Sequence, residues 1–483
     1  MAYQNLKAFT LQRLPFTQKY RHNMAILRNL FMWALLLCSL QTYAQQNLPV
    51  YSFLKDDTVL RKKLYDQSLL KKNSLIEQAG TENKKVYKGI YDDIFESIGS
   101  MWKSSRVVTE PKSYTYLNDI VKKIVSVNQE LQSLDLRIVF TRDWWPNAAC
   151  MADGSIVFNG GLMVYLQNEA ELAFILCHEI AHYYLQHNSK AIKKYVETVT
   201  SKEYQSELKR LARQEYGANK ELEVLAKTTA FNSRRHSRDN ESEADRYAYI
   251  FLKKTGYDAN GIKTALELLN KIDDSLLYKP ISVSQVFNFT DYAFKNKWVN
   301  KESAIFSSMD DRSGLSKKEK DSLKTHPDCL QRIEKLKDSI IQNKAGEGFI
   351  VNEKMFTQLK TDFFAEFTEE CYQQELLSRN LYYSLQLLQD ENKKRLGIYS
   401  IVRCLNDIYE AQKIKKLGNK IDSEDASYAA SYNELLRLLA RIRLEELANV
   451  NYYFCQQYES LMQDYPGFDK EILKARIIKN NYQ

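Results

Sequence analysis

The chain has 483 residues, of which only 15 are glycine and 7 are proline. This scarcity of helix-breaking residues favours long helices and argues against an all-β sandwich, a collagen-like chain and a disordered linker protein. The formal charge of +8 falls to +3, or 64 basic against 61 acidic residues, once residues 1–44 with their five basic side chains are left out. The charge therefore gives no indication of nucleic-acid binding.

The N-terminal segment has the pattern of a secretory signal peptide. Arg28 precedes an apolar run over residues 30–40, and the small residues Thr42 and Ala44 precede an expected cut before Gln45. The run has eleven residues, whereas a membrane span needs about 20. We therefore expect the mature protein to be exported, with a bacterial periplasm as its compartment. A retained segment would instead anchor the protein to the membrane.

The first half of the mature chain is predicted to contain helices and two strands. Residues 45–107 show helical apolar spacing, and a helix is expected from about Tyr114 to Leu131. Two short strands follow at Leu136–Thr141 and Ser155–Phe158, and their closeness in sequence predicts a small antiparallel sheet. Asn168–His187 is predicted to be a buried helix, because apolar residues surround it on nearly all sides.

The second half is expected to be mostly helical. A polar insertion over residues 190–230 leads to a helix from about Asn240 to Lys254. Residues 280–320 are mixed and charged, as in a long connection over the surface. From Asn352 onward the chain is helical again without a clear repeat period, which favours plain helical hairpins. The predicted fold class is therefore α+β and mostly helical.

One short motif carries the chemistry, the HEIAH sequence at residues 178–182. Histidines four residues apart lie on one face of a helix, so His178 and His182 can bind one metal ion. Glu179 flanks that ion, where a general base for a metal-activated water is needed. A buried glutamate beside two histidines needs neutralisation, which a metal supplies. The motif predicts one zinc ion per chain.

A third metal ligand has to come from elsewhere in the chain. The form of the motif with a histidine six residues further on fails, because Asn188 stands there. His187 lies off the ligand face, and a supporting role is favoured over ligation. On a second helix, Glu241 can bind the metal while Asp245, four residues later, orients a histidine ring. Glu243 lies on nearly the opposite face and should point to solvent or to a basic group.

With these motifs the sequence resembles the HtpX and CAAX-prenyl-protease family of zinc metallopeptidases. The resemblance rests on HEIAHYYLQH, SRDNESEADRYAYIFLKKTGYDANG and THPDCLQRIEKL, preceded by NAACMADGSIVFNGGLM, and spans about residues 110–340. It implies that His178, His182 and Glu241 bind zinc. It also implies that Glu179 is the catalytic base, in a compact zincin-like protease domain with the metal helix beside a small sheet.

The same resemblance draws attention to an HPxxxxR pattern formed by His326 and Arg332. One interpretation places His326 near the active-site cleft, where it gates the cleft or helps to bind the oxyanion. The other is helix punctuation, in which Arg332 pairs with an acidic residue. Cys177 departs from the family, which commonly has glycine there. No membrane span is visible in the catalytic region, which favours the secreted branch with a helical C-terminal module.

The strand over Ser155, Ile156, Val157 and Phe158 is expected to be an edge strand that binds substrate. The metal helix follows it closely in sequence. An extended peptide paired to that edge would therefore lie across the zinc, held by main-chain hydrogen bonds.

We therefore predict an N-terminal extension and signal peptide over residues 1–44, a helical segment over 45–107, a zinc metallopeptidase domain over 108–345 and a helical C-terminal module over 346–483. The predicted function is that of an exported zinc metalloendopeptidase in protein quality control. Its expected substrates are unfolded or misassembled exported proteins, and the C-terminal module is a candidate for binding a protein partner. The alternative is a chaperone-like or scaffold protein with a gated or weakly active protease site.

Overall fold

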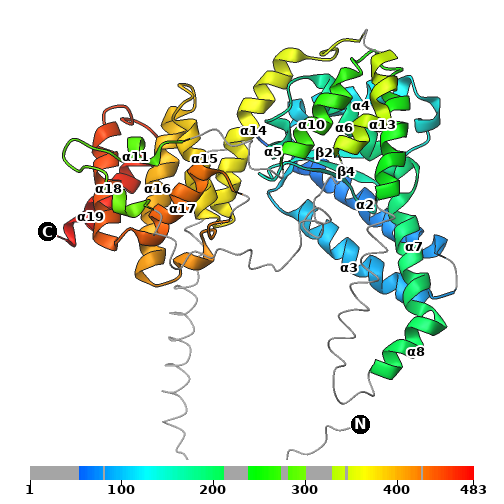
Figure 1. Cartoon of the computed structure of the whole chain (residues 1–483), viewed down its shortest axis with the longest axis horizontal. Coiled ribbons are helices and arrows are strands. Elements are labelled where there is room, and N and C mark those ends of the chain that lie inside the picture. The colour runs from blue at the N-terminus through cyan, green and yellow to red at the C-terminus, as the bar shows by residue number, and fades with distance from the viewer. Residues whose placement is uncertain are drawn as a thin grey trace, which may run out of the picture. The chain divides into compact units, whose positions relative to one another are not determined.

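The computed structural model describes residues 54–79, 82–211, 238–272, 281–300, 329–342, 346–425 and 428–482. The predicted signal peptide and His326 lie outside these ranges. The predicted α+β, mostly helical fold is confirmed, with one four-stranded sheet among many helices (Figure 1). No helix in the described part of the chain combines the length and the apolar character needed to cross a bilayer.

Two helices precede the catalytic region, α2 (Thr58–Gln78) and α3 (Lys84–Lys103), and they pack against each other. The Asp57 side chain caps α2 by accepting two backbone N–H groups of its first turn. Trp102, near the end of α3, is buried against Val139 and Val157 of the sheet. The apolar face of this helix pair therefore covers one face of the sheet.

The sheet consists of β1 (Val107–Val108), β2 (Arg137–Thr141), β3 (Ala148–Cys150) and β4 (Ser155–Asn159), in the order β1-β2-β4-β3. The two predicted strands, β2 and β4, lie parallel, with Arg137 opposite Ser155. Only β1–β2 and β3–β4 are antiparallel. The prediction of an antiparallel sheet is therefore wrong in this respect. The chain reverses direction twice between β2 and β4, because the intervening connection forms the extra strand β3.

The prediction that Ser155–Phe158 is an edge strand is also wrong. Every residue of β4 is buried, and the strand pairs with β2 on one side and β3 on the other. The outer strand on this side is β3, whose sequence Ala-Ala-Cys has little strand preference of its own. Such a three-residue strand forms only because β4 offers it a partner, so local sequence patterns do not reveal it.

Helix α6 (Glu169–Tyr184) is the centre of the catalytic region, and almost all of its residues are buried. The Asn168 side chain caps it by accepting the N–H of Glu171, as the sequence pattern predicts. The helix ends before the predicted His187, because Gln186 has a positive φ of 58° and the chain turns there into α7 (His187–Thr200).

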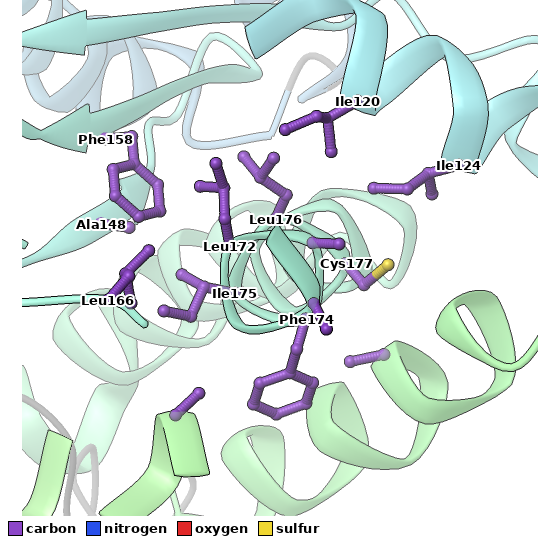
Figure 2. Close-up of a cluster of buried hydrophobic side chains, with 14 of the residues drawn as sticks. Ile120, Ile124, Ala148, Phe158, Leu166, Leu172, Phe174, Ile175, Leu176 and Cys177 are labelled. Carbon is purple, nitrogen blue, oxygen red and sulfur yellow. The ribbon is translucent and has the colours of Figure 1, made fainter. Parts of the chain in front are cut away.

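Figure 2 shows what surrounds α6. Its Leu172 and Leu176 lie between Ile120 and Ile124 on one side and Phe158 of the sheet on the other. Burial of such side chains stabilises the fold by about 1.5–3 kcal/mol each. The metal helix is therefore held rigidly between the sheet and its neighbouring helices.

Further helices complete this region. Helix α4 begins at Pro111, where the Glu110 side chain caps it and proline fits the first turn. The helical elements in chain order are α4 (Pro111–Ser126), η1 (Gln129–Leu131), α5 (Gly160–Met163), α8 (Lys202–Leu211), a helix over residues 238–252, α10 (Asn260–Ile272) and α13 (Cys329–Gln342).

The C-terminal helices begin with α14 (Glu353–Gln373), which packs against α4 and α5 of the catalytic region and also against α15 (Figure 1). Phe363 of α14 lies with its ring centroid 4.8 Å from that of Phe140 in the sheet. The remaining elements are α15 (Leu377–Leu387), α16 (Lys394–Lys413), η3 (Leu417–Asn419), α17 (Ala430–Arg441), α18 (Leu444–Tyr458) and α19 (Phe468–Asn480).

Residues 281–300, with α11 (Val283–Val286) and η2 (Asn296–Trp298), pack on α17 and α18. Glu446 of α18 accepts hydrogen bonds from Lys295 (3.0 Å) and from the buried indole N–H of Trp298 (3.0 Å). The predicted surface connection is therefore wrong for this part. Aromatic residues spaced along the segment supply apolar area that the C-terminal helices bury.

Candidate metal centre

Three side chains from two helices converge on one point. His178 and His182 come from α6, and Glu241 comes from the helix over residues 238–252. One ligand atom of each lies within 4.8 Å of the others. The two histidine Nε2 atoms are 3.1 Å apart, and each lies 3.3 Å from a carboxylate oxygen of Glu241. The one-turn spacing of the histidines brings both rings to the same side of α6.

The other nitrogen of each histidine ring faces a second side chain. Nδ1 of His178 lies 2.9 Å from Oδ1 of Asp245, and Nδ1 of His182 lies 2.9 Å from Nδ1 of His187. These contacts orient both rings with Nε2 toward Glu241. His187 itself reaches Glu243 through its Nε2, 3.2 Å from a carboxylate oxygen. Glu243 therefore lies outside the ligand cluster and beside a basic group.

Arg332 of α13 contacts both Asp245 and Glu241. Its guanidinium donates two hydrogen bonds to Asp245, at 2.6 and 2.7 Å, and its Nη1 lies 3.2 Å from Glu241. Arg332 and Asp245 are both buried. The structure thus gives Arg332 an acidic partner, as the helix-punctuation interpretation expects, whereas His326 lies outside the described residues.

This network shifts the pKa values of Glu241, Asp245 and His178. Burial alone would raise the pKa of Glu241, but hydrogen bonds from His178 and His182 and the charge of Arg332 hold that pKa well below its usual value. Burial also opposes ionisation of Asp245, yet Arg332 lowers its pKa to about 2. Burial would lower the pKa of His178, but Asp245 and Glu241 outweigh it and raise that pKa to about 10. The charges of Arg332 and of protonated His178 therefore balance the two carboxylates, of which Asp245 is buried and Glu241 is 14% exposed.

The residues present fit zinc. Two imidazole nitrogens and one carboxylate are the ligand types of catalytic zinc sites, which keep the fourth position open for substrate or water. Both Nδ1 atoms face other side chains, so both Nε2 atoms are directed to one point and lie 3.1 Å apart. Zinc held between them and Glu241 would replace the proton of His178 and take over its charge beside the carboxylate.

Glu179 lies beside this cluster without belonging to it. Its carboxylate accepts the backbone N–H of Cys150, the last residue of β3, at 2.7 Å. Burial raises the pKa of Glu179, and the positive histidines oppose that shift. A carboxylate with a raised pKa can both accept and return a proton near neutral pH. Glu179 thus has the properties of a general base and is tied to the edge strand.

Sequence reasoning missed the role of Asn188. Its side-chain amide donates to the carbonyl oxygen of Cys150 at 2.9 Å, so Glu179 and Asn188 engage both backbone groups of that residue. The sequence showed only that Asn188 stands where another class of zinc protease has a ligand. Without the existence of β3, no local pattern connects Asn188 with Cys150.

Comparisons with known protein sequences identify a peptidase family. Residues 111–340 match the sequence model of peptidase family M48. A putative beta-barrel assembly-enhancing protease of Vibrio cholerae is 25% identical over 179 residues, which are 36% of this chain and 36% of the relative. Metalloprotease YcaL of Escherichia coli is 27% identical over 182 residues, 37% of this chain and 67% of the relative. The beta-barrel assembly-enhancing protease of Escherichia coli is 25% identical over 169 residues, only 34% of its length. The match thus covers about a third of the length of the beta-barrel assembly-enhancing proteases.

Proposed function

Residues 111–340 are a domain of peptidase family M48, and from this premise we propose that the protein is an exported zinc-dependent metalloendopeptidase. One observation carries the proposal most directly. Glu179, a buried carboxylate with a raised pKa, lies between a cluster of three zinc-type ligands and the backbone of an edge strand. Peptide hydrolysis of this kind requires a general base, a set of metal ligands and a surface that binds an extended peptide.

Metal binding, orientation of the histidine rings and proton transfer fall to different residues of the chain. His178, His182 and Glu241 would hold zinc, with Asp245 and His187 fixing the two imidazole rings. Zinc, when bound, polarises the scissile carbonyl and lowers the pKa of water. Glu179 accepts the proton of the attacking water and returns it to the leaving amine.

The strand proposed to bind substrate is β3. In its antiparallel ladder with β4, Met151 donates to Ser155 and Asn159 donates to the carbonyl of Asn147. Because such ladders alternate, the backbone groups of Ala148 and Cys150 face the outer edge. Those of Cys150 are taken by Glu179 and Asn188. Ala148 is only 5% exposed, so an extended peptide can pair with its N–H and C=O only when the groups that cover this edge move aside.

Main-chain pairing also bears on the class of substrate. A peptide held by its backbone needs no particular side chains, which suits unfolded or misassembled proteins of varied sequence. The names of the beta-barrel assembly-enhancing relatives support substrates among exported proteins. Export of this chain rests on the signal pattern before Gln45, and N-terminal sequencing of the mature protein tests it.

Glu179→Gln tests the enzymatic proposal. The amide keeps the shape and can still accept the Cys150 N–H, but it cannot take a proton. We expect peptide cleavage to fall by at least about 100-fold, with zinc content unchanged, in a casein assay run with and without chelator. Glu243→Gln is the matched control, because Glu243 lies outside the cluster, and it should retain activity. An active Glu179→Gln variant, or a zinc-loaded wild type that cleaves nothing, would contradict the proposal and favour a scaffold function.

A further inference from the structure

We propose that the C-terminal helices hold the substrate strand in place through Arg379, a positioning residue for the peptidase site. Arg379 lies on α15, and its contact is Trp144 in the loop that connects β2 to β3. Arg379 acts through β3, so its role rests on the proposed function. The C-terminal helices would then determine how well β3 binds an extended peptide.

The contact between Arg379 and Trp144 is close, and it joins a buried arginine to a partly buried tryptophan. The guanidinium carbon lies 3.8 Å from the centroid of the Trp144 ring. Arg379 is only 8% exposed and pairs with Asp422 at 2.8 Å, with the rings of Tyr428 and Tyr432 also nearby. These groups of the C-terminal region orient the guanidinium, which lies over the Trp144 ring. Such a desolvated cation on an indole face is among the stronger contacts of its kind.

The same loop is attached to the C-terminal helices at a second point. Arg142, at the start of the loop, pairs with Glu366 of α14 in a buried ion pair. Arg142 also donates to the carbonyl of Leu54 at 3.0 Å, and the N–H of Leu54 donates to Glu366 at 2.9 Å. Both α14 and α15 therefore contact the connection that precedes the edge strand.

On its opposite side the loop packs tightly against Gly161. A Cβ atom on Gly161 would lie 2.0 Å from the carbonyl oxygen of Trp144, so the loop backbone rests directly on the start of α5. The N–H of Gly161 donates to Asp143 at 2.9 Å, and the Asn159 side chain donates to the carbonyl of Trp145 at 2.9 Å. The loop is clamped between the start of α5 and Arg379, which restricts the movement of the chain that leads into β3.

The loop leads to the proposed substrate strand but carries none of the metal ligands. Ala148, whose backbone is proposed to pair with substrate, lies four residues after Trp144, and Cys150 reaches Glu179. The zinc ligands lie on two other helices that the loop does not carry. Loosening the clamp should therefore weaken the binding of extended peptides and leave zinc binding intact.

The test uses the full-length zinc-loaded protein and a peptide substrate long enough to pair with β3. We expect Arg379→Met to raise KM by between about twofold and thirtyfold, with zinc content unchanged and a smaller change in kcat. Arg379→Lys keeps the charge and should recover part of the loss. Arg395→Met is the matched control: its guanidinium lies 5.2 Å from the Tyr465 ring within the C-terminal helices and does not contact the loop. It should leave KM unchanged.

A second variant keeps the test decisive if Arg379→Met folds poorly. Trp144→Leu removes the other partner, and it should raise KM to a similar extent. The double variant should add little further, because both changes remove one contact. A wild-type KM in either folded single variant, with cleavage still abolished by Glu179→Gln, would overturn the role of Arg379 and leave the proposed function standing. Absence of any cleavage by the wild type would instead overturn the proposed function itself, and the role of Arg379 with it.

Discussion

Three substitutions on one short segment test the assignment of the metal ligands: Glu241→Gln, Asp245→Asn and Glu243→Gln. Glu241 contributes an oxygen to the cluster, 3.3 Å from each histidine Nε2. An amide oxygen is a weaker zinc ligand than a carboxylate. We therefore expect Glu241→Gln to cost more than about 100-fold in zinc affinity, the largest loss of the three.

Asp245 acts one step further from the metal. Its Oδ1 faces Nδ1 of His178 at 2.9 Å, and both of its oxygens accept hydrogen bonds from Arg332. Asparagine offers one oxygen, so its NH2 group must face either Arg332 or His178. By the usual effect of removing a partner of a ligating histidine, zinc affinity should fall about 10–100-fold, which is about 1.4–2.8 kcal/mol. Arg332 keeps Glu241 as an acidic partner, so loss of the Asp245 charge should destabilise the fold by less than about 3 kcal/mol.

Glu243→Gln is the control within the same segment. Its side chain is 41% exposed and touches His187 alone among the cluster's neighbours in the described chain. Glutamine can still accept from that ring, so zinc affinity should change less than about threefold. Chelator competition measures the three affinities, at a temperature well below the unfolding of Asp245→Asn. Loss of zinc by Glu243→Gln with retention by Glu241→Gln would refute the assignment.

Two pH dependences follow from the same physical reasoning. In the metal-free protein the pKa of His178 is raised to about 10, so a proton must leave before Nε2 can bind zinc. Zinc affinity, measured by chelator competition, should therefore rise up to about tenfold per pH unit between about pH 7 and 9. A flat profile would contradict this reasoning. At the C-terminal helices burial would raise the pKa of Glu446, but Lys297, Lys295 and Trp298 lower it to about 2. The Glu446 carboxyl is therefore more acidic folded than unfolded, so its contribution to stability is present above about pH 4.5 and lost as the pH falls toward 2. Thermal unfolding between those values should depend less on pH in Glu446→Gln, and an unchanged pH dependence would contradict the role of this carboxylate.

The metal centre was largely predictable from sequence because its geometry is local. Residues four apart on a helix lie on one face whatever the rest of the chain does. This places His178 with His182, and Glu241 with Asp245, and it separates Glu243 from both. The burial of α6 was equally visible, since a helix that is apolar on all sides can only be enclosed. Periodicity therefore determines which side chains of one helix lie together, whereas the meeting of Glu241 with the two histidines depends on how the two helices pack.

Strand order and long-range partners needed the tertiary structure. Whether β4 is an edge or an internal strand depends on β3, three residues that become a strand only when β4 is there to pair with them. Arg332 meets Asp245 across 87 residues of sequence, and Arg379 meets Trp144 through packing of α14 on the catalytic region. Periodicity specifies which face of an element is apolar, but many elements present such faces. Only the simultaneous packing of all of them decides which faces meet, and with them which polar groups become partners.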